Sequence, residues 1–272
     1  MRSTELRSDR VEPSPAAATP VAPLDGMKVL VTGASSGIGR SIALAAARAG
    51  ADVALTYKDN EDGARATVRN VEVLGRNATA IRLDLADEAA VARAADVARD
   101  ALGRVDAWVN NAGADVLTGD GARLSDIDKL DLLLRVDLRG TMIASWRAVE
   151  VMAEQEEGGV IVNMSWDHAL AGMPGRNPEI FSAVKGGVLS FSKSLARTVA
   201  PRVRVNVVAP GWIETAFGAG LDDERRRAVA EATPLGRWGT PDDVAAAALF
   251  LMSPVASFLT GQTIMVGGGI VM

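Results

Sequence analysis

Short apolar runs alternate with longer amphipathic stretches along the chain from Met27 onward. The runs read MKVLVT, ADVALTY, ATAIRL, VDAWVN, GVIVNMS, RVRVNVVA and QTIMV. They are continuously apolar, a pattern typical of strands that are buried on both faces of a sheet. The regular order of strand and helix predicts parallel strands joined by right-handed helical crossovers. We therefore expect a doubly wound α/β fold, in which helices cover both faces of one parallel sheet.

The segments between these runs carry helix-boundary signals. In DEAAVARAADVARDALG, apolar residues recur at helical spacing and Gly103 stands where a helix C-terminus is expected. In TPDDVAAAALFLM, Thr240 is suited to cap a helix, Pro241 to occupy its first position and Asp243 to return the capping-box hydrogen bond. No internal repeat or second domain is apparent.

The length of the chain fits one domain. Its 272 residues are 48% hydrophobic, enough for one large α/β core, which we expect over residues 25–272. Residues 1–24 mix charged residues with Pro, Ala and Thr around no apolar signal-peptide core, so a disordered tail is predicted there. No uncharged apolar run approaches the ~20 residues that span a bilayer. We expect a cytoplasmic protein with no membrane partner.

Composition argues against several function classes. The formal charge of −5 is spread over interspersed acidic and basic residues, so no basic face for nucleic acid is predicted. The chain has no cysteine and a single histidine, His168. Disulfides, a thiolate nucleophile and a metal site are therefore not expected.

The segment LVTGASSGIGRSIALAAARAG carries the first motif that indicates chemistry. An apolar run ends at Thr32, glycines follow at Gly33, Gly37 and Gly39, and an alanine-rich helix begins within the same turn. Glycines there let the backbone turn sharply and approach a pyrophosphate, while the helix N-terminus offers free N–H groups. This context predicts a Rossmann-like dinucleotide site.

The second strand segment bears on the choice of dinucleotide. Sites for NAD usually place a carboxylate at the tip of this strand to hold the ribose hydroxyls, whereas here DVALTY is followed by Lys58. A cation there favours the 2′-phosphate of NADP(H) over NAD(H). Asp59 and Glu61 weaken its field, and the alternative is an ordinary surface lysine.

Four motifs in this order resemble the short-chain dehydrogenase/reductase (SDR) family, in particular its members similar to 3-oxoacyl-(acyl carrier protein) reductases. They are the glycine-rich motif, NNAG at 110–113, an aromatic-x-x-x-Lys at Phe181 and Lys185, and PGWIET at 210–215. Gly267 stands where the family commonly has an aspartate. The resemblance implies a sheet of about seven strands and NAD(P)(H)-dependent hydride transfer. It also implies a small-molecule carbonyl or alcohol substrate, and a homodimer or homotetramer.

The resemblance further implies which residues bind the cofactor. The glycine-rich loop would hold the pyrophosphate, Asp84 and Leu85 the adenine, and Lys185 the nicotinamide ribose. The full set is Gly33, Ser35, Ser36, Gly37, Ile38, Gly39, Lys58, Asp84, Leu85, Asn111, Ala112, Gly113, Lys185, Pro210, Gly211, Ile213 and Thr215.

Three of the family's four catalytic positions differ in this chain. In the family, a tyrosine four residues before the lysine protonates the carbonyl oxygen, a serine binds that oxygen and an asparagine holds a water. Phe181 stands at the tyrosine position, and the chain's one tyrosine is Tyr57, so no shift of register restores it. Asp137, in LLLRVDLRGTM, replaces the asparagine. We expect its carboxylate to pair with Lys185 and hold it charged.

The serine position and the proton donor are open. Counting forward from VIVNMS puts Trp166 at the serine position, next to Ser165, whereas counting back from Phe181 puts His168 there. Losing a positioned acid typically costs ~10²- to 10⁴-fold in rate. His168 could replace it because an imidazole can donate a proton at neutral pH, and Asp167 and Asp137 are the other candidates. The alternative is that His168 and Asp167 are ordinary loop residues.

Three functions follow, of which the first is favoured: an NADP(H)-dependent oxidoreductase with a rearranged acid, a nucleotide-binding protein that has lost the reaction, or a non-redox dehydratase, isomerase or cyclase.

Trp166 and Trp212 follow strand ends and should flank the cleft. The segment after PGWIET should form a substrate lid, and the charged run at 225–227 a solvated helix face. Four lid residues are expected to line an apolar pocket: Ala216, Phe217, Leu221 and Trp238.

Overall fold

The computed structural model describes residues 23–272. The disordered tail predicted over residues 1–24 lies outside them except for its last two residues. Of these, Leu24 is fully buried, and its N–H donates to the Ala49 carbonyl oxygen at 2.9 Å. Leu24 therefore belongs to the folded core.

Seven parallel strands form one sheet, as predicted. Their order across the sheet is 3-2-1-4-5-6-7, so the direction of progression reverses between the first and fourth strands. Val29 of the first strand aligns with Val53 on one side and Ala107 on the other. The strands are β1 (Lys28–Val31), β2 (Asp52–Tyr57), β3 (Ala78–Arg82), β4 (Ala107–Asn110), β5 (Gly159–Met164), β6 (Val203–Pro210) and β7 (Thr263–Val266).

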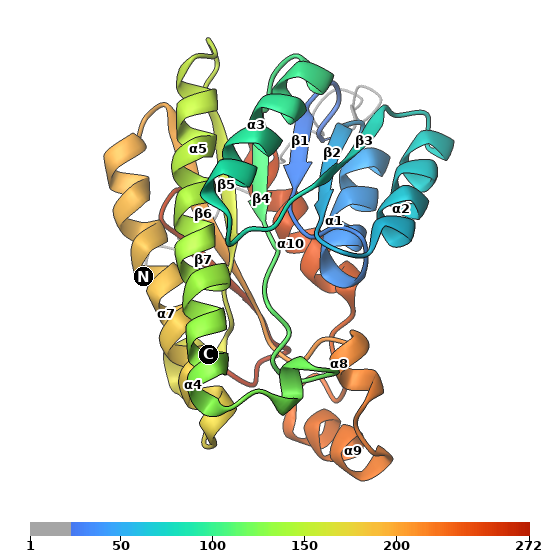
Figure 1. Cartoon of the computed structure of the whole chain (residues 1–272), viewed down its shortest axis with the longest axis vertical. Coiled ribbons are helices and arrows are strands. Elements are labelled where there is room, and N and C mark those ends of the chain that lie inside the picture. Colours follow the sequence, from blue (N-terminus) through green and yellow to red (C-terminus); the bar gives the residue numbers. More distant parts are fainter. Residues whose placement is uncertain (1–22) are drawn as a thin grey trace, which may run out of the picture.

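Helices cover both faces of the sheet (Figure 1). The helices are α1 (Gly37–Arg48), α2 (Glu61–Val73), α3 (Glu88–Leu102), α4 (Asp126–Leu133), α5 (Thr141–Ala153), α6 (His168–Ala171), α7 (Arg176–Val199), α8 (Ala216–Ala219), α9 (Asp223–Ala232) and α10 (Pro241–Met252). Shorter turns are η1 (Gly121–Arg123) and η3 (Pro254–Ala256), and η2 (Leu134–Gly140) is a π-helical segment. One apolar cluster packs α1, α2 and α10 on one face, and a second packs α3, α5 and α7 on the other.

Both predicted helix ends are confirmed. Gly103 follows α3 in the left-handed region, with φ +81°, where a side chain would be strained. Thr240 and Asp243 form a capping box before α10, with Pro241 in its first turn. Local signals in the sequence therefore set where these two helices stop and start.

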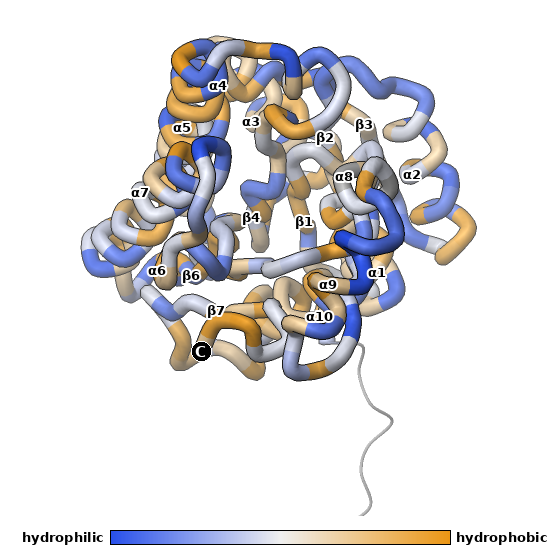
Figure 2. The backbone as a smooth tube through the Cα atoms, turned by 90° about the horizontal axis from the view of Figure 1, so that it is seen from below, coloured by the Kyte–Doolittle hydropathy of each residue, from blue (hydrophilic) through white to orange (hydrophobic). Residues whose placement is uncertain are grey.

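The candidate site lies at the carboxyl edge of the sheet, where the strand order reverses. The chain continues from β1 and β4 to helices on opposite faces of the sheet, an arrangement that places a ligand crevice at this edge in such folds. Seen from this edge, α4 and α7 lie on one side and α8 and α9 on the other (Figure 2). Within residues 23–272, no helix has the length and apolarity to cross a bilayer.

Candidate active site

A groove of about 540 Å³ follows the loops after β1, β2, β3 and β4. It brings together thirteen of the residues predicted to bind the cofactor: Gly33, Ser35, Ser36, Gly37, Ile38, Gly39, Lys58, Asp84, Leu85, Asn111, Ala112, Gly113 and Thr215. The other predicted cofactor residues line an adjoining cavity: Lys185, Pro210, Gly211 and Ile213.

The glycine-rich loop is shaped to approach a phosphate group. Gly33 and Gly37 have φ +65° and +53°, a conformation that side chains disfavour. A Cβ at Gly39 would lie 2.4 Å from the Gly33 carbonyl oxygen. Helix α1 begins at Gly37 with no acidic residue in its first turn and no side-chain cap from Ser36. Its N–H groups and positive dipole end therefore fit a pyrophosphate.

The loops after β1 and β4 are hydrogen-bonded to each other. The Thr32 hydroxyl oxygen accepts from the N–H groups of Asn111 and Ala112 at 2.9 and 3.0 Å. The Asn111 side-chain amide donates to the carbonyl oxygens of Thr32 and Gly33 at 3.0 and 3.1 Å. This network fixes the floor of the groove where a dinucleotide would cross the sheet.

Lys58, predicted to favour NADP(H), has a carboxylate partner. Its Nζ lies 3.0 Å from Asp84 Oδ2, and both side chains are substantially exposed. Burial alone would raise the pKa of Asp84, but a hydrogen bond from the Ala86 N–H and the ammonium of Lys58 outweigh burial, and the pKa is lowered. A 2′-phosphate at this site would share Lys58 with Asp84.

A second cavity, of about 630 Å³, adjoins the groove near Gly37 and Asn111. Its walls are mainly apolar and include Trp166, Phe181 and Trp212. The prediction that the two tryptophans flank the cleft is confirmed. Both cavities share lining residues, so a cofactor in the groove would reach the apolar cavity with one end.

The predicted lid residues differ in their placement. Ala216 lines the apolar cavity, whereas Leu221 and Trp238 do not. Trp238 is buried and packs edge-to-face on Trp212, with ring centroids 5.6 Å apart. The side chain of Phe217 lies outside the described part of the chain. The expectation for Trp238 was wrong because this ring packs behind Trp212 rather than beside the cavity.

Asp137 and Lys185 form a buried ion pair in the cavity wall. Asp137 Oδ2 lies 2.9 Å from Lys185 Nζ, with side chains 1% and 8% exposed. Asp137 comes from the π-helical segment η2, a distortion that often occurs at functional sites. Its Oδ1 accepts from the Ala114 N–H at 2.8 Å, and Lys185 Nζ lies 5.4 Å from the Phe181 ring centroid. The predicted pairing is confirmed.

Phe181 and Ser165 both line the cavity, but neither offers it a hydroxyl group with a free proton. Phe181 has none, and the buried Ser165 hydroxyl donates to the Lys185 carbonyl oxygen at 2.9 Å. Trp166, the alternative occupant of the serine position, packs edge-to-face on Phe181 with centroids 5.3 Å apart. The wall beside Lys185 is therefore aromatic.

Asp167 and His168 lie behind this wall. Neither lines the cavity. His168 stacks on Trp166 at 5.0 Å between centroids, and its N–H and Nδ1 both lie 2.6 Å from Asp167 Oδ1. Asp167 is fully buried, in a slot bounded by Gly211 and Gly267. A Cβ at these glycines would lie 2.5 and 2.2 Å from Asp167 Oδ2, which explains the glycine where the resemblance leads one to expect an aspartate.

Comparison with known proteins assigns the family. The family model described as enoyl-(acyl carrier protein) reductase matches residues 33–271. The chain belongs to the short-chain dehydrogenase/reductase family. A 3beta-hydroxysteroid dehydrogenase 1 from Eggerthella lenta is 37% identical over 249 residues, 90% of this SDR and 94% of that protein. A 3-oxoacyl-[acyl-carrier-protein] reductase from Aquifex aeolicus is 37% identical over 250 residues, 90% and 98% of the two chains.

A solved structure bears on the cofactor of this SDR. A short chain dehydrogenase from Burkholderia cenocepacia, solved in complex with NADP, has a TM-score of 0.82 and 35% identity, covering 91% of this chain and 99% of that one. The relatives are named dehydrogenases and reductases, and this structure carries a nicotinamide dinucleotide. Together they support hydride transfer with a nicotinamide cofactor for this SDR.

Two polar residues of the SDR cavity were missed in the sequence. Asn177 lines it from α7, one turn before Phe181, and Asp115 lines it from the loop after β4. The spacing of four residues from Phe181 was a usable signal for Asn177, because such residues share a helix face. Asp115 accepts from the N–H groups of Leu117 and Thr118, a loop geometry with no distinctive sequence signal.

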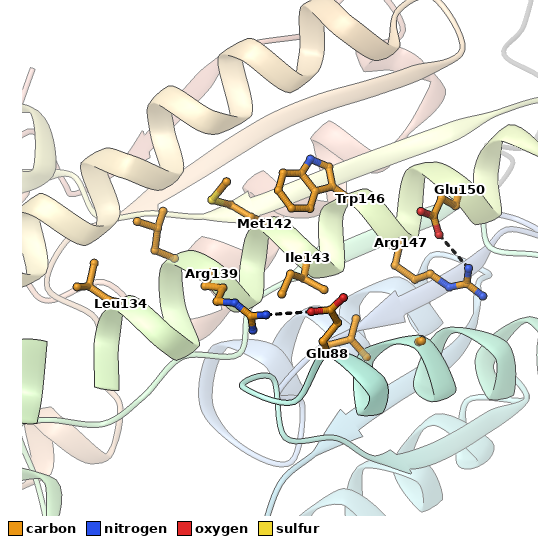
Figure 3. Close-up of a pocket in the computed structure, with 11 residues that line it drawn as sticks. Glu88, Leu134, Arg139, Met142, Ile143, Trp146, Arg147 and Glu150 are labelled. Atoms are coloured by element: carbon orange, nitrogen blue, oxygen red, sulfur yellow. Dashed lines mark hydrogen bonds and ion pairs between the residues drawn. The ribbon is translucent and has the colours of Figure 1, made fainter. Parts of the chain in front are cut away.

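A separate groove of about 510 Å³ lies on the outer surface of α3, η2 and α5 (Figure 3). Leu134 and Trp146 line it and are 39% and 48% exposed. Ion pairs at its rim join Arg139 to Glu88 at 2.9 Å and Arg147 to Glu150 at 2.9 Å. No predicted site residue lines this groove. Among the residues that the structure describes, no group of His, Asp and Glu side chains is placed to hold a metal ion.

Proposed function

We propose that this SDR is an NADP(H)-dependent oxidoreductase for apolar carbonyl or alcohol substrates, in which Lys185 supplies the proton that the family's tyrosine supplies elsewhere. The observation that carries this proposal is the buried ion pair of Lys185 with Asp137, 2.9 Å long, which faces the apolar cavity beside Phe181. An ammonium that lines the cavity is a proton donor where the phenol is missing.

The cofactor, when bound, supplies or takes up the hydride. As the hydride reaches the carbonyl carbon, Lys185 donates one proton from Nζ to the carbonyl oxygen, and the product is an alcohol. Asp137 holds Nζ in position, and the Ala114 N–H holds Asp137. Lys185 then regains a proton from solvent. In the oxidative direction, neutral Lys185 accepts the alcohol proton.

Asp167 and His168, the acids considered from the sequence, receive a structural role in this proposal. Trp166 contacts both the His168 ring and the Phe181 ring, and neither acid lines the cavity. We therefore infer that Asp167 and His168 hold Trp166 and the loop after β5 in position. An aromatic ring packed on both sides holds the shape of the cavity wall.

The preference for NADP(H) rests on Lys58 at the tip of β2. No carboxylate follows Tyr57 directly there, and Lys58 is held over the groove by Asp84. A lysine attracts a 2′-phosphate as a point charge. The substrate class rests on the lining: Trp166, Trp212 and Phe181 suit an apolar body.

A second function, a nucleotide-binding protein without turnover, is favoured by one observation. Phe181 has no hydroxyl group, and the Ser165 hydroxyl donates its proton to the Lys185 carbonyl oxygen instead of to a reacting oxygen. Under this alternative the cofactor groove is retained for sensing or for a partner subunit.

Turnover assays separate the two functions. We expect wild type to oxidise NADPH with apolar ketones, and Lys185→Met to lose at least ~10²-fold in kcat. His168→Ala should stay within about threefold of wild type, because it does not touch the reacting atoms. NADPH binding, followed by fluorescence, without turnover on a broad panel of ketones would support the second function instead. A loss of tenfold or more in His168→Ala alone would return the acid role to His168.

A further inference from the structure

Three side chains of α7 form one stripe along the cavity wall. Asn177, Phe181 and Lys185 are spaced four residues apart, so they lie on one helix face, and all three line the cavity. An ideal helix separates the first and last Cα atoms by about 12 Å. The stripe therefore offers an ammonium at the cofactor end, a phenyl ring in the middle and an amide at the far end.

The orientation of the Asn177 amide is set by a buried lysine. Lys129 of α4 is 7% exposed, and its Nζ donates to Asn177 Oδ1 at 3.2 Å. An ammonium has only donors, so the amide must turn its oxygen toward Lys129 and its NH₂ group the other way. Within residues 23–272, no group accepts a hydrogen bond from Asn177 Nδ2.

The pair has no evident role in stability. Within the same described range, Lys129 forms no ion pair with a carboxylate. A buried charge without a counter-charge costs free energy. Asn177 lines the cavity and its Nδ2 is open to it, so a ligand there can accept from this donor. The nearby ammonium favours a ligand oxygen that carries negative charge, which would supply the missing counter-charge.

We infer that Asn177 is a substrate-binding residue and Lys129 its positioning residue. Together they bind an acceptor oxygen, best a carboxylate, at the far end of an elongated apolar ketone or alcohol. The reacting carbon of that substrate lies near Lys185, and its apolar body lies along Phe181. Only the placement of the reacting end rests on the proposed function, because the oxygen-binding end follows from Lys129 and Asn177 alone.

Three straight-chain methyl ketones test this inference. Each has seven methylenes between the ketone carbonyl and a terminal carboxylate, primary amide or methyl group. We expect wild type to favour the carboxylate over the methyl compound at least ~10-fold in kcat/KM, with the difference in KM, because a hydrogen bond to a charged group is lost. The amide, a neutral acceptor, should lie between them.

Variants assign the preference to the two residues. Asn177→Leu should bring the carboxylate-to-methyl ratio to about one, and Asn177→Asp, which keeps the partner of Lys129 but removes the donor, should bring it to one or below. Lys129→Met should also bring the carboxylate-to-methyl ratio of kcat/KM to about one, whereas Lys129→Arg should retain most of the preference. Lys193→Met, which removes an exposed lysine of the same helix α7, should leave the ratio unchanged. Thermal melting checks that each variant folds.

Calorimetric titration of each ketone into the NADPH-saturated protein keeps the inference apart from the proposed function. One outcome is that wild type binds the carboxylate ketone more tightly than the methyl ketone, that Asn177→Leu loses this preference, and that no ketone is turned over. This outcome would uphold the inference and overturn the proposed function. Turnover with equal kcat/KM for the carboxylate and methyl ketones would overturn the inference and uphold the proposed function. Neither binding nor turnover of the carboxylate ketone would also overturn the inference.

Discussion

At the scale of single residues, the rearranged site that we propose rests on positions that lie beside one another. Phe181 carries no hydroxyl group, and the Asp137 carboxylate holds Lys185. Asp167 occupies the space beside Gly267, where the resemblance leads one to expect an aspartate. Because these residues lie in one contiguous region, we propose that they form one rearranged site.

The slot around Asp167 gives the first prediction. Gly267→Ala would place a Cβ 2.2 Å from Asp167 Oδ2, so we expect it to lower the free energy of unfolding by about 1–3 kcal/mol. Asp167→Gly in the same chain should relieve the overlap and recover part of that loss. Urea unfolding of the two single variants and the double variant measures the coupling. Additive losses would show that the two positions do not compete for this space.

Lys58 gives the second prediction. Lys58→Glu should weaken NADPH binding at least ~10-fold, since a carboxylate repels the 2′-phosphate, and should weaken NADH binding little. Fluorescence titration with both cofactors measures this. Arg69→Glu, an exposed change on α2 outside the groove, is the control for added negative charge. Equal losses of affinity for NADPH and NADH would show that Lys58 does not determine cofactor specificity.

At the scale of elements, one buried carboxylate joins neighbouring strands. Asp52, at the start of β2, accepts from Lys28 Nζ of β1 at 2.6 Å and from the Asn77 N–H before β3 at 2.9 Å. Burial alone would raise the pKa of Asp52, but the hydrogen bonds from Lys28 and Asn77 outweigh burial and lower it to about 2 from 3.8. The ionised carboxylate therefore stabilises the N-terminal edge of the sheet.

This shift predicts a pH dependence of stability. Because the pKa is lower in the folded state, the stabilisation is fully present above about pH 4 and is lost as the pH falls toward about 2. It amounts to about 2 kcal/mol. Asp52→Asn should be less stable than wild type by about that amount at pH 7 and should approach wild type at low pH. Urea unfolding across this range measures it, and parallel curves would contradict the assignment.

Secondary structure was predictable from the sequence because its causes are local. Continuous β-branched runs became the seven strands, and Gly103 and Thr240 ended and began helices where their chemistry requires. The pairing of Asp137 with Lys185 was also predictable, because the motif spacing places both at one site. The place of His168 was not. Its stacking on Trp166 depends on how the loop after β5 folds back, which no local pattern encodes.

The same limit applies to contacts between distant segments. Asp167 packs against Gly267, a hundred positions further along the chain, and Lys129 of α4 donates to Asn177 of α7. Such contacts follow from packing of the complete fold. The sequence presents Gly267 only as a departure from the family and Asn177 only as a helical position near Phe181.

At the scale of the whole molecule, the groove in Figure 3 bears on assembly. We expect a homodimer or homotetramer in which the exposed Trp146 and Leu134 are covered by a second copy, since an exposed apolar groove with charged rims is typical of an interface. Trp146→Glu should shift the protein toward monomer in analytical ultracentrifugation. Val73→Glu, at an exposed apolar residue of α2, should not. A wild-type monomer at micromolar concentration would contradict this expectation.

The proposed activity depends on Lys185, held in position by Asp137, replacing the family's tyrosine as the source of the proton. The most direct measurement is single-turnover reduction of an apolar ketone by NADPH in wild type, in Asp137→Asn, in Phe181→Tyr and in the double variant. We predict that Asp137→Asn lowers the rate at least ~10-fold in the wild-type background. It should lower the rate much less in the Phe181→Tyr background, because a phenol then donates the proton. Equal effects of Asp137→Asn in both backgrounds, or no reduction by wild type, would contradict the account.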